Sequence, residues 1–471
     1  MTQTEDAAKF VEGSTMRHVI TMTATASVGL MAIFIVDFAN LFYISLLGKA
    51  ALAAAIGYAG TVLFFNTALC IGITIAAAAL VSRALGAGDR ERARRMGASA
   101  LVFMVLFSGL MVAIQLPLLD PILGLLGATG ETRSVALGFL YIVVPSLPLL
   151  GLGMCLSGLL RAVGDAKRAM YVTLWGGLAS AVLDPILIFG LDLEVTGAAI
   201  ATVLSRTALV AAGWYGAIRI HNLVARPRPG DVAEDMRPLL GIAVPAVLTN
   251  VATPVGNAYM TAALADFGDE VIAAWAVIGR LIPIAFGTIF ALSGAIGPIM
   301  GQNFGARRFD RVRQTLVDAL IFTSIYTLGV WTGLYLLQDA IVDLFSASGR
   351  MADLVRFFCT VVAVTWLFNG ALFVANAAFN NLGFATYSTV FNWGRAVLGT
   401  IPFVLAGAHY GGAEGALLGQ GLGGVVFGTA AMIVCFRVVA DLKIKPDLAR
   451  PEAVGQSALS AFSSGKSANL G

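Results

Sequence analysis

Apolar runs of about 20 or more residues recur along this chain from one end to the other. A helix of that length crosses the roughly 30 Å hydrocarbon core of a bilayer. Charged residues make up only 12% of the 471 residues, whereas soluble domains carry about 25%. We therefore predict an all-α polytopic membrane protein.

The apolar runs fall into two groups of six, separated by a polar linker that is rich in proline and charge. We predict five parts: the N-terminus 1–18, a six-helix lobe 19–220, the linker 221–237, a second six-helix lobe 238–436, and the tail 437–471. The twelve predicted transmembrane segments are 19–46, 52–82, 96–120, 134–160, 168–190, 195–220, 238–265, 270–300, 313–336, 354–381, 386–408 and 412–436.

The loops between these segments alternate in charge. Basic residues gather in every second loop, as at Arg92 and Arg311, while the opposite loops hold acids such as Asp192 and Glu270. Because cytoplasmic loops carry the excess of lysine and arginine, both termini are predicted to be cytoplasmic.

The two halves of the chain repeat each other. The stretch beginning at Leu85, LGAGDRERARR, aligns with FGARRFDRVRQ beginning at Phe304, and the same offset places Gly164 on Gly383. Since each half has six spans, both copies keep the same topology. The repeat predicts two parallel six-helix lobes with a central cleft between them.

Several function classes are disfavoured by the sequence. The basic residues lie in short loops and do not indicate nucleic-acid binding. The four cysteines lie in apolar runs without paired spacing, so they are interpreted as packing residues. The motif GQGLGG (Gly419–Gly424) lies inside a predicted membrane helix, so its match to a dinucleotide-binding pattern is interpreted as chance. We expect no catalytic residue, no bound cofactor and no ATP site, and no metal ligand is identified with certainty. The chain is therefore predicted not to be an enzyme.

The first lobe contains rare polar residues inside its spans. Asp37 lies deep in the run FIVDFANLFYISLLG, and Asp184 interrupts SAVLDPILIFG. Ser180 lies one turn from Asp184 on the same helix face, and Thr202 lies at a similar depth. A charge at the bilayer centre costs about 2.5–3.5 kcal/mol, so such acids usually face a polar cavity. The four residues are predicted to bind a coupling cation, H+ or Na+; the open alternative is acids that bond neighbouring helices.

Other polar residues interrupt the spans as well. Arg206 is expected to neutralise an aspartate or to line the cleft, and Arg280 and Arg395 to line a cavity or form ion pairs. In the repeat, Asp37 matches Asn257, so the cation site is predicted in the first lobe alone. The candidate cavity or substrate contacts are Asn40, Tyr141, Arg206 and Asn257.

Three stretches resemble the multidrug and toxic compound extrusion (MATE) transporters: VDFANLFYISLLGKAALAA, GPIMGQNFGARRFDRVRQ, and the segment from Leu159 to Arg206. The resemblance implies twelve helices in two lobes and efflux of organic, often cationic and aromatic compounds against entry of protons or sodium. The acids Asp37 and Asp184 resemble the DinF-like branch, whose cation site also matches Thr202. Ser180 stands where that family often has Asn, which favours proton coupling.

The resulting hypothesis is a cation-coupled drug antiporter of the bacterial inner membrane. It is expected to act as a monomer among membrane lipids on small-molecule drugs, without nucleic acid. Protonation of Asp37 or Asp184 is expected to repack helices one, five and six, so that the substrate leaves. One departure from the family is Thr25, which stands where the repeat has Pro245. A flippase for lipids or lipid-linked oligosaccharides, a receptor or scaffold, and a channel remain as alternatives.

Overall fold

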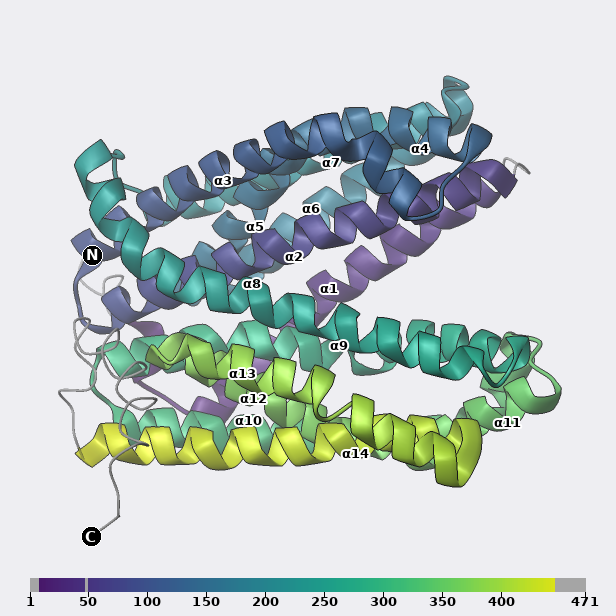
Figure 1. Cartoon of the computed structure of the whole chain (residues 1–471). Helices are drawn as coiled ribbons and strands as arrows, with labels where there is room; N and C mark the ends of the chain where they lie inside the picture. The colour runs from purple at the N-terminus through teal and green to yellow at the C-terminus, as the bar shows by residue number, and fades with distance from the viewer. Residues whose placement is uncertain (1–7, 47–49, 445–471) are drawn as a thin grey trace, which may run out of the picture. The chain divides into compact units, whose positions relative to one another are not determined.

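The computed structural model describes residues 8–46 and 50–444, and every regular element in that part is helical (Figure 1). The α-helices are α1 Thr15–Leu46, α2 Ala50–Gly86, α3 Arg90–Leu125, α4 Gly130–Val143, α5 Leu147–Ala162, α6 Ala166–Pro185, α7 Glu194–Trp214, α8 Pro229–Ala265, α9 Asp269–Gly305, α10 Phe309–Leu344, α11 Gly349–Phe357, α12 Trp366–Leu382, α13 Ala385–Val397 and α14 Ile401–Ile444. Short 3-10 helices are η1 Lys9–Val11, η2 Val144–Ser146 and η6 Ala363–Thr365; π-helical segments are η3 Ile186–Gly190, η4 Tyr215–Ile220 and η5 Phe358–Val362.

Eleven helical stretches in the described part are long and apolar enough to cross a membrane. The last stretch, Ala385–Ile444, is 60 residues long, which exceeds one crossing. Its helix α14 breaks at Gly411 and Gly412, whose backbone angles are not helical. The break separates the predicted segments 386–408 and 412–436. The prediction of an all-α, multi-pass membrane protein is therefore confirmed.

Glycines bring the two halves of α14 into backbone contact. A Cβ added to Gly415 would lie 2.0 Å from the carbonyl oxygen of Gly407. A Cβ on Gly423 would lie 1.6 Å from the carbonyl oxygen of Gly399, in the short stretch that precedes α14. Small residues allow such close helix packing in lipid, where no hydrophobic effect drives helices together. The glycines of the GQGLGG motif thus serve packing.

The chain folds into two compact units, each a helical bundle (Figure 1). Most of the first unit is Thr25–Ala243, and the second unit contains Phe10–Ala24 and the described residues from Val244 to Ile444. Helices α1 and α8 therefore each contribute residues to both units. The sequence did not indicate this exchange, and the predicted boundaries at 220 and 238 stay a prediction.

The internal repeat is visible in the backbone of the turns. Residues with positive φ recur at one constant offset in the two units, although some positions are glycine and others are not. The four pairs are Gly88 and Arg307, Gly127 and Ser346, Gly130 and Gly349, and Gly164 and Gly383. The two halves therefore share turn geometry, as the alignment of their sequences predicted.

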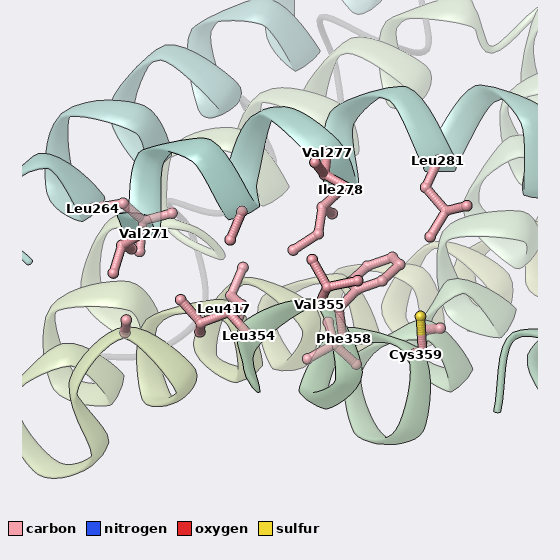
Figure 2. Close-up of a cluster of buried hydrophobic side chains, with 14 of the residues drawn as sticks. Leu264, Val271, Val277, Ile278, Leu281, Leu354, Val355, Phe358, Cys359 and Leu417 are labelled. Atoms are coloured by element: carbon pink, nitrogen blue, oxygen red, sulfur yellow. The ribbon is translucent and has the colours of Figure 1, made fainter. Parts of the chain in front are cut away.

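The second unit has an apolar core where α9 meets α11, η5 and α14 (Figure 2). Ile278 and Val355 are fully buried there, and Phe358 is 2% exposed. Cys359 lies in the same cluster with a free thiol. Cys70, Cys155 and Cys435 are likewise buried and free, so the four cysteines pack as apolar residues.

Candidate functional site

Asp184 is the central residue of the candidate site. It lies one residue before the end of α6 and is only 1% exposed. The Ser180 hydroxyl donates a hydrogen bond of 2.7 Å to its Oδ2 atom. Its other oxygen, Oδ1, is buried without a hydrogen-bond partner in the described part of the chain. A carboxylate in this position is stable only when a proton or another cation neutralises it.

The backbone around Asp184 departs from a regular α-helix. Pro185 has no N–H group, so the carbonyl of Ala181 loses its helical partner. The chain then continues as the π-helical segment η3, and such segments are frequent at functional sites. Helix α7 approaches η3 closely at Gly197, where a Cβ would lie 2.6 Å from the carbonyl oxygen of Leu187. The sequence around Asp184 therefore makes a helix end that is packed but irregular.

The other predicted residues of this layer have separate partners. The Thr202 hydroxyl donates to the carbonyl of Ala198 in its own helix, at 2.8 Å, so no hydrogen bond joins it to Asp184. The Arg206 guanidinium donates to the carbonyl of Val143 at 3.0 Å and to the Ser146 hydroxyl at 2.8 Å. Arg206 is 6% exposed and forms no ion pair with a described residue. Within these residues, the structure brings together Ser180 and Asp184.

Of the four other predicted site residues, the structure describes the side chains of two. The side chains of Asp37 and Asn40 lie outside those that the structure describes, so their predicted roles stay predictions. Tyr141 on α4 is 50% exposed. Asn257 on α8 is exposed, and its carbonyl accepts a hydrogen bond from Thr261.

Two arginines stand inside spans of the second unit. Arg280 lies on α9, about 16 Å from the start of that helix at 1.5 Å per residue, and its side chain is exposed. Arg395 on α13 donates to the Thr253 hydroxyl at 3.0 Å, and its Nε atom is buried without a hydrogen-bond partner. Among the described residues neither arginine forms an ion pair. The predicted choice between ion pairing and cavity lining stays a prediction for both arginines.

Two buried amide groups were not identified from the sequence. In the first unit, Asn66 and Gln115 donate to each other's side-chain oxygens. In the second, Asn392 donates to the Asn376 side chain at 2.9 Å, beside Ser388. Polar residues in apolar runs were the available signal. Both groups satisfy hydrogen bonds internally, as buried polar groups must.

The MatE family model matches residues 25–186 and again residues 245–405. The chain belongs to the MatE family. The two matches fall on the two halves of the repeat, one in each unit. MatE proteins of known structure also share this fold. A mutant of the Vibrio cholerae MATE transporter VcmN is 23% identical, with a TM-score of 0.87 over 93% of this chain and 99% of that one. A MOP superfamily transporter from Pyrococcus furiosus has a TM-score of 0.86 over 94% of this chain and 99% of that one, at 20% identity.

Curated MatE relatives differ in what their names say they transport. A protein of Shewanella oneidensis named FAD transporter is 27% identical over 433 residues, which cover 91% of this chain and 96% of that protein. The multidrug export protein MepA of Staphylococcus aureus is 25% identical over 359 residues, which cover 74% of this chain and 77% of MepA. These relatives place the chain among membrane transporters of small molecules and leave its cargo open.

Proposed function

We propose that this MatE protein is a secondary active exporter that moves an organic small molecule outward in exchange for protons. One observation carries the proposal: Asp184 is 1% exposed inside a membrane span, and among the described residues only a serine hydroxyl is hydrogen-bonded to its carboxylate. A group that must be neutralised to be stable changes the packing around it when it gains or loses a cation. The predicted role of Asp184 as a coupling residue rests on this point.

The surroundings of Asp184 favour a proton over a sodium ion. Hard metal cations collect about six oxygen ligands. The Ser180 hydroxyl is the one described group that is hydrogen-bonded to the carboxylate, because the Thr202 hydroxyl bonds its own helix. A proton needs no such shell. Asp37 remains a predicted second carboxylate of the same site.

The first test separates the two driving ions. Purified protein in liposomes is given a pH gradient or a sodium gradient alone, and ethidium accumulation is followed by fluorescence. We expect the pH gradient to drive accumulation and the sodium gradient to have no effect. Accumulation with sodium alone would contradict proton coupling. No response of any tested compound to either gradient would contradict antiport and favour the flippase or receptor alternatives.

A second candidate function, export of anionic cargo, is supported by Arg280 and Arg395. The membrane part of α8 from Val244, helix α9 after Glu270, and α13 contain no aspartate or glutamate. The two arginines thus bring positive charge to spans without acidic residues. An unpaired cation at this depth needs a polar cavity or an anion. The name of the Shewanella oneidensis relative, FAD transporter, fits a phosphate-bearing cargo.

Substitution of both arginines distinguishes the two cargo classes. We expect Arg280→Gln with Arg395→Gln to lower pH-driven FAD transport at least tenfold, because hydrogen bonds to charged groups contribute about 1.5–3 kcal/mol. Ethidium transport should be unchanged or faster. Arg350→Gln is the matched control, since Arg350 pairs with Glu414 at an exposed position. An equal loss of both transport activities would contradict an anion-specific role.

A further inference from the structure

Helices α1 and α8 each begin in one unit and continue in the other. Residues Phe10–Ala24 group with the second unit, whereas α1 from Thr25 onward groups with the first. Helix α8 does the reverse, because its residues up to Ala243 group with the first unit and those from Val244 with the second. The two changeover points correspond to each other in the internal repeat.

In the second unit, a buried carboxylate holds the start of α1. The Thr15 hydroxyl donates a hydrogen bond to Oδ2 of Asp318 on α10, and the Gln314 amide donates to Oδ1 at 2.8 Å. Asp318 is 4% exposed and Thr15 is 6% exposed. A buried carboxylate keeps such partners because losing one leaves a charge unsatisfied. We name the Thr15–Asp318 contact clasp 2.

The residues just before Thr15 are held by the same unit. Phe10 is 1% exposed, and its N–H donates to the Gln302 side chain at 2.8 Å. The Arg311 guanidinium donates to the carbonyl oxygens of Phe10, Glu12 and Gly13 at 2.9–3.0 Å. These contacts fix the backbone whatever its side chains are. The start of α1 is therefore anchored over several residues.

The first unit contains the equivalent contact at the start of α8. The Ser99 hydroxyl on α3 donates to Oδ2 of Asp235 at 2.7 Å, and Arg95 donates to Oδ1 at 3.0 Å. Asp235 is 1% exposed. We name the Ser99–Asp235 contact clasp 1.

The linker before α8 is held by the first unit as well. Arg90 donates to the carbonyl of His221 at 2.9 Å, and Arg94 donates to the Asn222 side chain at 3.0 Å. The His221 ring contacts Asp165 at 2.8 Å. Burial raises the pKa of Asp165, but its hydrogen bonds, the strongest from His221, outweigh burial and keep that pKa well below its usual range. Asp165 thus stays charged and keeps its contact with the His221 ring in the linker.

The two clasps occupy equivalent positions with donor and acceptor exchanged. The offset that aligns Arg92 with Arg311 also aligns Ser99 with Asp318, and an offset one residue longer aligns Thr15 with Asp235. In clasp 1 the hydroxyl is on α3 and the carboxylate is on α8. In clasp 2 the hydroxyl is on α1 and the carboxylate is on α10. The hydrogen bond between hydroxyl and carboxylate therefore has its donor and acceptor positions exchanged between the two halves.

We propose that α1 is a strap whose anchorage by clasp 2 transmits cation binding in the first unit to the second unit. Clasp 1 anchors α8 in the reverse direction. The proposal rests on the coupling function proposed above. Helix α1 is continuous from Thr15 to Leu46, so Asp37 follows Thr15 on the same helix. A continuous helix anchored at its first turn carries a displacement along its length, whereas a released end relaxes locally.

The test compares coupling with binding in variants of clasp 2. We expect Thr15→Val and Asp318→Asn each to reduce pH-driven ethidium accumulation at least fivefold. Ethidium binding by the purified variants, and the proton release that accompanies it, should match wild type, because the cation site is intact. Thr332→Val is the matched control, since Thr332 is an exposed threonine that bonds only its own helix among the described residues. It should accumulate ethidium like wild type.

Exchange of the two side chains provides a rescue. Thr15→Asp combined with Asp318→Thr copies the polarity of clasp 1, and we expect it to recover at least half of the wild-type accumulation. Wild-type accumulation by Thr15→Val and Asp318→Asn would overturn the proposed strap and leave the proposed proton coupling standing. Loss of ethidium binding in these variants, or no recovery in the exchanged variant, would do the same. If wild-type protein accumulates nothing under either gradient, the proposed coupling and the strap both fail.

Discussion

The Asp184→Asn variant should bind substrate and yet fail to accumulate it under a pH gradient. The asparagine has nearly the same size but cannot exchange a proton, so the group that ties transport to the gradient is lost. A pH gradient equivalent to about 100 mV supplies about 2.3 kcal/mol per proton, which corresponds to roughly fifty-fold accumulation of ethidium when it exchanges one for one with protons. We expect this ratio to fall to about one in Asp184→Asn liposomes, measured by ethidium fluorescence.

Ser180→Ala provides the control for this experiment. It removes the 2.7 Å hydrogen bond to the carboxylate but leaves the carboxylate itself. Accumulation should persist in this variant, with a shifted pH dependence. Wild-type accumulation by Asp184→Asn would contradict the role proposed for Asp184. Loss of ethidium binding in that variant would show damage to the fold instead, so binding must be measured on the same preparation.

The Gly423→Ala variant should destabilise the second unit strongly. The new Cβ would lie 1.6 Å from the carbonyl oxygen of Gly399, and a backbone atom cannot move aside as a flexible side chain can. Overpacking typically costs about 1–3 kcal/mol, and we expect at least the upper value here. The apparent melting temperature of the detergent-solubilised protein should fall by roughly 5 °C or more.

Gly329→Ala is the matched helix substitution. Gly329 lies on α10, and its added Cβ would meet no atom within 4 Å. Its melting temperature should stay close to that of wild type, because exposed substitutions usually change stability by less than about 0.5 kcal/mol. Equal melting temperatures for the two variants would contradict the close packing of α14 against the backbone at Gly399.

The fold was largely predictable from the sequence, because its strongest constraint is local. Each span appears as an apolar run, and the repeat appears at a constant offset between residues such as Gly164 and Gly383. The contact of Ser180 with Asp184 also follows from helical spacing. The family resemblance rested on these same runs, and the MatE match confirmed it. The DinF-like branch stays a prediction.

Contacts to backbone atoms of distant residues could not be predicted in this way. Arg206 binds the carbonyl of Val143, and Arg311 binds the carbonyls that precede α1. Any residue supplies a carbonyl, so such partners leave no pattern in the sequence. The glycines near Gly423 suggested a nucleotide motif by spacing, whereas the folded chain uses them to bring helices together. The exchange of helix starts between units is likewise a tertiary property.

Proton release on substrate binding tests the central claim, that substrate and proton are coupled through Asp184. By linkage, a substrate that favours the deprotonated site must release the proton when it binds. Ethidium is added to purified protein in weakly buffered detergent solution with a pH indicator. We predict release of about one proton per bound ethidium by wild type and none by Asp184→Asn. Equal release by the two proteins, or none by wild type despite ethidium binding, would contradict the account.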